Sequence, residues 1–537
     1  AEDDHGRTAL MYAALFGYDE TVDVLLDAGA EVEAQDKSSN TALLVAASRG
    51  HTSIVEKLVH AGAELEARDE NNSTALILAA SKGYDDIVKE LMRAGAELEA
   101  QNRHGDTALV LASSEGHTNI VKELMRAGAT LEAQDEYNDT ALIVAASRGY
   151  SDIVTELVHA RAKLEDRNAQ NATALIVAAS RGHSVIVTKL VRAGARLQAQ
   201  DQSGSTALIL AAEQGYTNIV DELVHAGAEL EAQNMYNDTA LISAALNGHA
   251  GVVQGLVRAG AELDAQNAYN NTALIVAASK GHARVVEELA HAGAELEAHD
   301  ASGRTALLHA AKNGDLQVVE TLAALGAEPN VRDDRNDSAL TLAEQSGTDP
   351  ETSHKLAKAL VGSGATLGGG LTALMVAAAH GRAKEVERLL NASSASVEYT
   401  DFLGLTAFGW AAAFCRKGTM EILAENGADV NARDRDGNTA MHLTVRDCQE
   451  DDEAQCNCSA SVHTLLDLNA SITLHGPAGL LPCGVAAVEG KESLLPLLRV
   501  TAYQRLWASE GSPWFWVSVA ALGVTLLAGL VSLGMAF

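Results

Sequence analysis

The stretch TALLVAASRGHTSIVEKLVHAGAELEARDENNS, residues 41–73, is one copy of a sequence that returns every 33 residues over most of the chain. Its opening triplet, Thr-Ala-Leu or a close variant, begins at Thr8, Thr41, Thr74, Thr107, Thr140, Thr173, Thr206, Thr239, Thr272, Thr305, Ser338, Thr372, Thr406 and Thr439. A degenerate further copy is centred on residues 485–490. Such a strict period predicts a solenoid, in which each repeat buries its apolar side chains only against its neighbours.

Within one repeat, the sequence predicts two helices and an arm. Thr41 precedes the apolar run at residues 42–47, so we expect it to cap the N-terminus of the first helix. Gly50 permits a tight turn into a second helix, and Gly62 supplies the left-handed residue that ends this helix. Residues 63–67, Ala-Glu-Leu-Glu-Ala, alternate as a short extended arm does.

The residues that define the repeat recur in register, as in Thr41, Ala42, Leu43, Ala46, Ala47, Gly50, His51, Ile54, Val55, Leu58, Ala61, Gly62 and Ala63. This pattern resembles the ankyrin repeat and covers about residues 1–500. The resemblance implies an all-α repeat solenoid of helix–turn–helix units with β-hairpin arms. Residues 426–432 and 436–442 come closest to the family's usual sequence. Arg161 and Ser394 depart from it, because they stand where the Gly that ends the second helix is expected.

The repeats divide the chain into a regular and an irregular part. They are regular over residues 1–337 and irregular over residues 338–500. The irregular part contains insertions near 346–351, 362–370 and 447–460. Residues 501–513 form a juxtamembrane linker, followed by an uncharged segment at 514–537. The chain opens inside a repeat at Ala1, which is consistent with a removed leader or with upstream repeats.

The uncharged C-terminal segment is predicted to form one transmembrane helix, because it is long enough to span a bilayer. Trp514 and Trp516 stand at its start, where interfacial aromatic residues anchor such helices. A stripe of small residues, which allows close helix contact, is formed by Ala521, Thr525 and Gly529. This end resembles a single-pass tail anchor, with the array facing the cytosol or the stroma or matrix side of an organelle membrane. A buried core helix is the alternative.

Composition and motifs exclude several classes of function. The formal net charge is −33, which argues against a nucleic-acid partner, because phosphate binding needs a basic face. The chain contains no Gly-rich phosphate loop, nucleophile elbow, His-Glu-x-x-His or Cys-x-x-Cys. We therefore predict that it is not an enzyme and holds no cofactor or metal. Recurring pairs such as Gly50–His51 are interpreted as structural turns, and arm residues such as Glu64 and Glu66 as solvated side chains.

The five Cys residues are odd in number and lie outside the regular repeats. They do not predict a disulfide framework, and they favour a reducing compartment. Cys448, Cys456 and Cys458 share the acidic insertion near 447–460. An acidic surface loop is predicted there, with a zinc site or a disulfide as the alternatives.

Candidate partner-binding residues recur at the end of the first helix of several repeats. These residues are Arg49, Lys82, Arg148, Arg181 and Lys280. The family resemblance implies that they lie along a concave face together with the acidic arms. Two signs of charge along one groove predict selection of a partner by electrostatic complementarity. Trp410 lies among several aromatic residues and is a second candidate contact if it is exposed, the alternative being that it fills an irregular layer.

These features together predict a membrane-tethered scaffold for protein–protein interaction, acting as a docking subunit of a membrane-associated complex. Its expected partners are proteins, bound through the acidic ankyrin array, and the membrane, bound through the C-terminal helix. Two alternatives remain. One is a fragment of an ankyrin-bearing ion channel, and the other is an adaptor that recruits an enzyme to the membrane.

Overall fold

The computed structural model describes residues 2–366, 368, 370–391, 396–447, 458–476, 479–491 and 493–499. The chain divides into two compact units, and the boundary falls after Ala273. We call the repeats before this boundary unit 1 and those after it unit 2, and describe each unit by itself.

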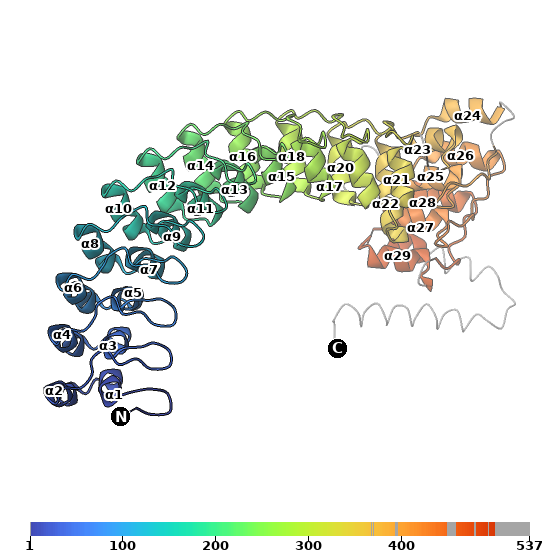
Figure 1. The fold of residues 1–537 in the computed structure, drawn as a ribbon. Coiled ribbons are helices and arrows are strands. Elements are labelled where there is room, and N and C mark those ends of the chain that lie inside the picture. Colours follow the sequence, from blue (N-terminus) through green and yellow to red (C-terminus); the bar gives the residue numbers. More distant parts are fainter. Residues whose placement is uncertain are drawn as a thin grey trace, which may run out of the picture. The chain divides into compact units, whose positions relative to one another are not determined.

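Unit 1 is a stack of repeats, each of which contains two helices. The first helices are α1 (Ala9–Phe16), α3 (Ala42–Arg49), α5 (Ala75–Lys82), α7 (Ala108–Glu115), α9 (Ala141–Arg148), α11 (Ala174–Ser180), α13 (Ala207–Gln214) and α15 (Ala240–Leu246). The second helices are α2 (Asp19–Asp27), α4 (Thr52–His60), α6 (Asp85–Arg93), α8 (Thr118–Arg126), α10 (Ser151–His159), α12 (Ser184–Arg192), α14 (Thr217–His225) and α16 (Ala250–Arg258). They form two rows, and the loops that join the repeats project beside the row of first helices (Figure 1).

Unit 2 opens with α17 (Ala273–Ser279), which begins at the boundary. Its other helices are α18 (Ala283–His291), α19 (Ala306–Asn313), α20 (Leu316–Ala324), α21 (Ala339–Gln345), α22 (Pro350–Gly362), α23 (Ala373–Ala379), α24 (Ala383–Asn391), α25 (Ala407–Ala413), α26 (Lys417–Glu425), α27 (Ala440–Asp447), α28 (Cys458–Asp467) and α29 (Pro482–Val488). α22 has 13 residues, against 9 in most second helices, and the insertion near 346–351 forms its start. The side chain of Asp349 caps this helix by accepting a hydrogen bond of 3.0 Å from Thr352 N–H.

The predicted helix ends are confirmed. Thr41 is extended (φ −92°), and its Oγ1 accepts a hydrogen bond of 3.3 Å from Leu44 N–H. This bond satisfies one of the backbone donors that a helix leaves free at its start. Gly62 is left-handed (φ 86°) where the second helix stops, and Arg161 adopts the same conformation (φ 66°) in place of Gly. The stop therefore depends on backbone conformation rather than on a glycine in every repeat.

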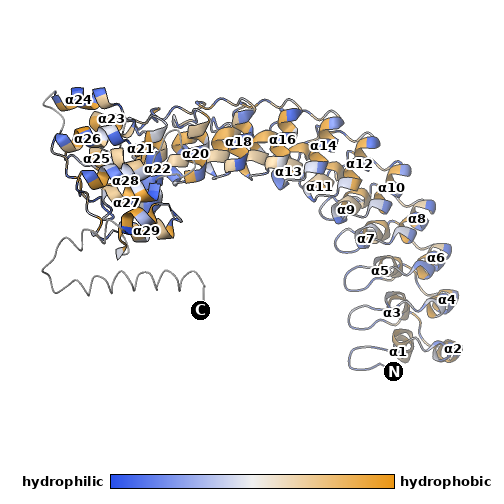
Figure 2. Ribbon diagram, turned by 180° about the vertical axis from the view of Figure 1, so that it is seen from behind, coloured by the Kyte–Doolittle hydropathy of each residue, from blue (hydrophilic) through white to orange (hydrophobic). Residues whose placement is uncertain are grey.

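Small aliphatic side chains fill the space between the two rows. In the repeat that starts at Thr41, Leu43 and Ala46 of α3 and Ile54 and Leu58 of α4 are each at most 1 % exposed. The same positions are buried in the repeats that follow, and Figure 2 shows hydrophobic residues on helices of both rows. Each repeat thus buries one layer of core between its neighbours, as the period predicts.

The β-hairpin arms implied by the family resemblance are not supported, because the described residues contain isolated bridges but no strand. The loop at Asp69 shows the physical reason. Its Oδ1 accepts hydrogen bonds from Asn71 N–H (2.9 Å) and Ser73 N–H (2.8 Å), so a carboxylate satisfies donors that a strand partner would otherwise take. Adjacent loops are joined by single backbone bonds, such as the one of 3.0 Å from Glu70 N–H to Ser38 O.

The predicted transmembrane helix lies outside the described residues, and with it Trp514, Trp516, Ala521, Thr525 and Gly529. Where the structure does describe the chain, none of its helices has the length and hydropathy that a bilayer crossing requires. The transmembrane helix therefore stays a prediction.

Candidate functional site

The first helices of unit 1 carry two parallel rows of side chains on one face. The apolar row lies four residues after the opening Thr in the repeats that begin at Thr41 to Thr206. It is half-buried and consists of Val45, Leu78, Leu111, Val144, Val177 and Leu210. The charged row lies eight residues after the opening Thr in the repeats that begin at Thr41 to Thr173. It is exposed and consists of Arg49, Lys82, Glu115, Arg148 and Arg181. Because residues four apart lie on the same side of a helix, the two rows run next to each other.

All five basic candidates are exposed, as expected, but they do not form one continuous series. Lys280 directly follows α17 and belongs to unit 2. In unit 1, Glu115 interrupts the charged row. The remaining residues form two neighbouring pairs, Arg49 with Lys82 and Arg148 with Arg181. Whether they contact a partner stays a prediction.

Asp139 adds a carboxylate beside the second pair. Its Oδ1 is buried and has no hydrogen-bond partner in the described part of the chain. Burial raises the pKa of Asp139, and a hydrogen bond from the Asn168 side chain and the nearby charge of Arg181 oppose this rise. The face near α9 and α11 therefore presents two basic side chains, and the carboxyl group of Asp139 lies near one of them, Arg181.

The arm carboxylates are divided between two roles. Glu64 and Glu97 are exposed, as predicted. Glu66 is only partly exposed, and its Oε1 accepts a hydrogen bond of 2.7 Å from the backbone N–H of Glu97 in the next repeat. The same contact is made by Glu33, Glu99, Glu165 and Glu231 in unit 1. The interpretation of these residues as merely solvated is wrong, because each side chain ties two repeats together.

The Gly-His turns have the structural role that was predicted for them. The His117 ring lies over Gly83, and its Nε2 is 3.2 Å from Ser81 O of the preceding repeat. In alternate repeats a tyrosine takes this place, as Tyr84 does over Gly50. These rings fill space between repeats and are not candidate ligands.

Trp410 is not a surface residue, so its assignment as a partner contact is wrong for this fold. It is 0 % exposed, and its Nε1–H donates a hydrogen bond of 2.7 Å to Asp401 Oδ2. Burial raises the pKa of Asp401 to about 6, although the bonds from Leu405 N–H and Trp410 oppose this rise. The alternative, that the aromatic side chain fills an irregular layer, agrees with this burial.

Helix α22 covers Trp410, a contact that the sequence analysis missed. The His354 ring stacks on Trp410, with 6.4 Å between ring centroids and 11° between planes. One turn further along α22, the Lys358 ammonium lies 5.6 Å from the centroid of the Phe414 ring. Trp410 and Phe414 lie four and eight residues after Thr406, so they correspond to the apolar and charged rows of unit 1. The sequence signal was this pair of aromatic residues, at positions that are aromatic also in the first repeat, as Tyr12 and Phe16.

The end of α27 completes the α22 contact. His354 Nε2 is 2.7 Å from Asp447 Oδ2, and Lys358 Nζ donates a bond of 2.9 Å to Asp447 O. Burial alone would raise the pKa of Asp447, but the hydrogen bond from His354 and the charges of Lys358 and Arg446 outweigh it and keep the pKa low. Asp447 lies eight residues after Thr439 and thus also occupies the charged-row position.

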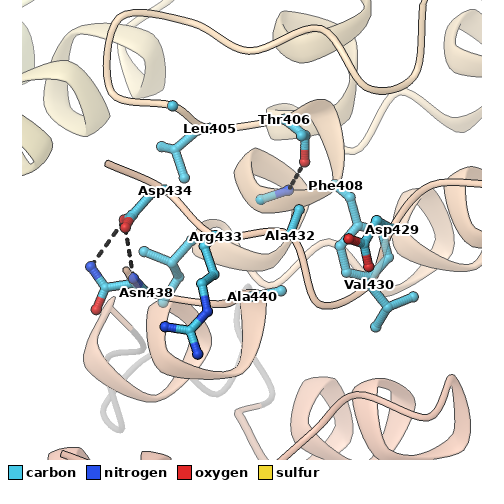
Figure 3. Close-up of a pocket in the computed structure, with 13 residues that line it drawn as sticks. Leu405, Thr406, Phe408, Asp429, Val430, Ala432, Arg433, Asp434, Asn438 and Ala440 are labelled. Carbon is cyan, nitrogen blue, oxygen red and sulfur yellow. Dashed lines mark hydrogen bonds between the residues drawn. The ribbon is translucent and has the colours of Figure 1, made fainter. Parts of the chain in front are cut away.

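Pockets of several sizes occur in the described residues. The cavity between Leu405 and Ala432 measures about 10 Å³, which is the space of one water molecule (Figure 3). Larger pockets of about 310 Å³ and about 200 Å³ lie beside Lys57 and beside Arg49, respectively. No group of three or more His, Cys, Asp or Glu side chains in the described part is arranged to hold a metal. Cys448 and Cys456 lie outside the described residues, as does the side chain of Cys458, so their alternatives stay open.

Comparison with known proteins agrees with the fold. A family model described as "Ankyrin repeats (3 copies)" matches residues 10–102, 76–168, 142–234, 175–267, 241–333 and 351–434. A search of curated proteins finds no match. The overlapping family matches cover more than half of the chain and coincide with the stacked helix pairs, so the chain belongs to the ankyrin repeat family.

Proposed function

We propose that this protein is a scaffold for protein–protein interaction and that its partners dock on the charged row of unit 1. The observation that carries the proposal is the exposure of Arg49, Lys82, Arg148 and Arg181. The fold does not need these side chains for its core or its helix caps. They lie beside the half-buried apolar row. A partner on this face could therefore bury apolar surface against one row and be selected by its charge at the other.

We further propose that residues 514–537 tether this scaffold to a membrane, with the array on the cytosolic side or its organellar equivalent. The support is the sequence: an uncharged segment that begins with Trp514 and Trp516. Deleting the segment should move the protein from the membrane fraction to the soluble fraction. Membrane association that persists after a carbonate wash of the deletion variant would contradict the tether.

The docking proposal is tested by reversing the charge of the row. The test variant replaces all four basic residues of the row in unit 1 by Glu. The control has the same change in net charge on the second helices, where the exposed basic residues are Arg93, Arg126, Arg192 and Arg258. Each protein is tagged and used to capture partners from membranes in mild detergent, followed by mass spectrometry.

The wild type and the control should retain the same partners, and the row variant should lose them. Capture by the wild type should also weaken at high salt, because exposed charges are screened. If all three proteins retain the same partners, the charged row does not bind them.

A further inference from the structure

We infer that the α9–α11 slot of unit 1 binds an α-helix of a partner that presents carboxylates one turn apart. The slot is formed by Val144 and Arg148 of α9 together with Val177 of α11 and Arg181, which directly follows it. This inference rests on the proposed function and names the partner chemistry for one part of that face. The observation that supports the inference is that α22 already covers the corresponding positions of α25 and α27.

The α22 contact defines how a helix lies on this face. His354 stacks on Trp410, and Lys358 lies over Phe414. The two contacting residues of α22 are four apart in sequence, and so are the two aromatic residues that they contact. Residues four apart mark successive turns on one side of a helix. α22 therefore runs in the same direction as α25, along it rather than across the repeats.

The same contact spans two neighbouring repeats. His354 and Lys358 both contact Asp447 at the end of α27. Their ring contacts, with Trp410 and Phe414, are made to the preceding repeat. The covered positions are withdrawn from solvent: Trp410 is 0 % exposed, and the side chain of Asp447 is 4 % exposed. This fold thus holds a helix against the apolar and charged rows of two adjacent first helices.

In the α9–α11 slot, the corresponding charged-row positions are exposed, and they carry positive charge where Asp447 carries negative charge. Arg148 and Arg181 stand at charged-row positions like that of Asp447, and both are exposed. Val144 and Val177 are half-buried in the apolar row. In unit 2, the Lys358 ammonium and the His354 imidazole of the bound helix face a carboxylate, so by charge complementarity this slot favours carboxylates in their place.

The α22 sequence supplies both a probe and its control. The probe is a fluorescent peptide of residues 350–362 with the changes His354→Glu and Lys358→Glu, and the control is the unchanged peptide. Binding to the full-length protein is measured by fluorescence anisotropy. The protein variants are Arg148→Glu with Arg181→Glu and, as a charge-matched control, Arg93→Glu with Arg126→Glu. Circular dichroism checks that each variant keeps its helicity.

The Glu peptide should bind the wild type and the charge-matched control equally, and bind the slot variant about tenfold more weakly. The unchanged peptide should show the reverse preference, binding the slot variant better than the wild type. This exchange of preference would not arise from a general loss of folding. A photo-crosslinker on the Glu peptide should label α9 or α11.

The inference is overturned if the Glu peptide does not bind the wild type, or if it binds all the protein variants equally. Labelling only outside α9 and α11 overturns it as well. Each of these outcomes is distinguishable from failure of the proposed function. If partner capture still depends on the charged row while the peptide fails, the scaffold function stands and the helical binding mode is wrong.

Discussion

Arg161 offers a direct test of the backbone rule that ends each second helix. Its φ of 66° places an L-residue in the left-handed region, which costs about 1–2 kcal/mol. The equivalent residues Gly128 and Gly194 have nothing within 4 Å of an added Cβ, so this position imposes a backbone cost and no steric clash. Arg161→Gly removes that cost but adds about 0.5–1 kcal/mol of unfolded-state entropy. The expected net stabilisation is about 0.5–1 kcal/mol.

Hydrogen exchange suits this prediction better than a global melting temperature, because the stability of a repeat array is distributed over its repeats. Amides at the end of α10, such as that of Ala162, which donates to Leu157 O, should exchange more slowly in Arg161→Gly. The control Gly128→Ala makes the opposite change in the preceding repeat and should speed exchange there. Unchanged or faster exchange in Arg161→Gly would refute the argument, because it would show that the left-handed residue is not strained.

Two further predictions concern other parts of the fold. The pKa of Asp401 is raised from 3.8 to about 6, so between these pH values the native carboxyl holds a proton that the unfolded chain releases. The contribution of Asp401 to the free energy of unfolding therefore falls as pH rises from about 4 to about 6. Relative to Asp401→Asn, chemical denaturation of the wild type should show a loss of about 3 kcal/mol over this range, and parallel pH profiles would contradict the prediction. Gly83→Ala should destabilise the protein by about 1–3 kcal/mol more than Gly95→Ala. The reason is that the Cβ added at Gly83 would stand 2.6 Å from the ring of His117, whereas a Cβ at Gly95 would have no neighbour within 4 Å. Equal losses of stability for the two variants in thermal unfolding would show that the ring moves aside freely.

For the candidate site, the sequence predicted which residues are exposed but not how they are grouped. The exposure of Arg148 and Arg181 follows from their place at the ends of α9 and α11, a local property. The proximity of Arg181 to Asp139 depends on the packing of the repeats, because the two residues lie in different repeats. Trp410 was misplaced for a similar reason: its exposure is set by α22, which precedes it by about 50 residues.

The sequence by itself determined the repeat architecture of this protein. Thr41 as a helix cap and Gly62 as a helix stop depend on backbone sterics and on hydrogen bonds within a few residues, so they can be recognised without tertiary information. Repetition of these signals at one period then fixed the stack of helix pairs.

Only the tertiary structure decided the contacts that join separate repeats. Glu66 accepts a hydrogen bond from a backbone donor 31 residues away. His354 and Asp447 meet across 93 residues. These contacts depend on the direction in which one repeat follows another, which is set by the packing of whole helices. The glutamate of the Glu66 contact recurs with the period, but the period does not show what its side chain binds.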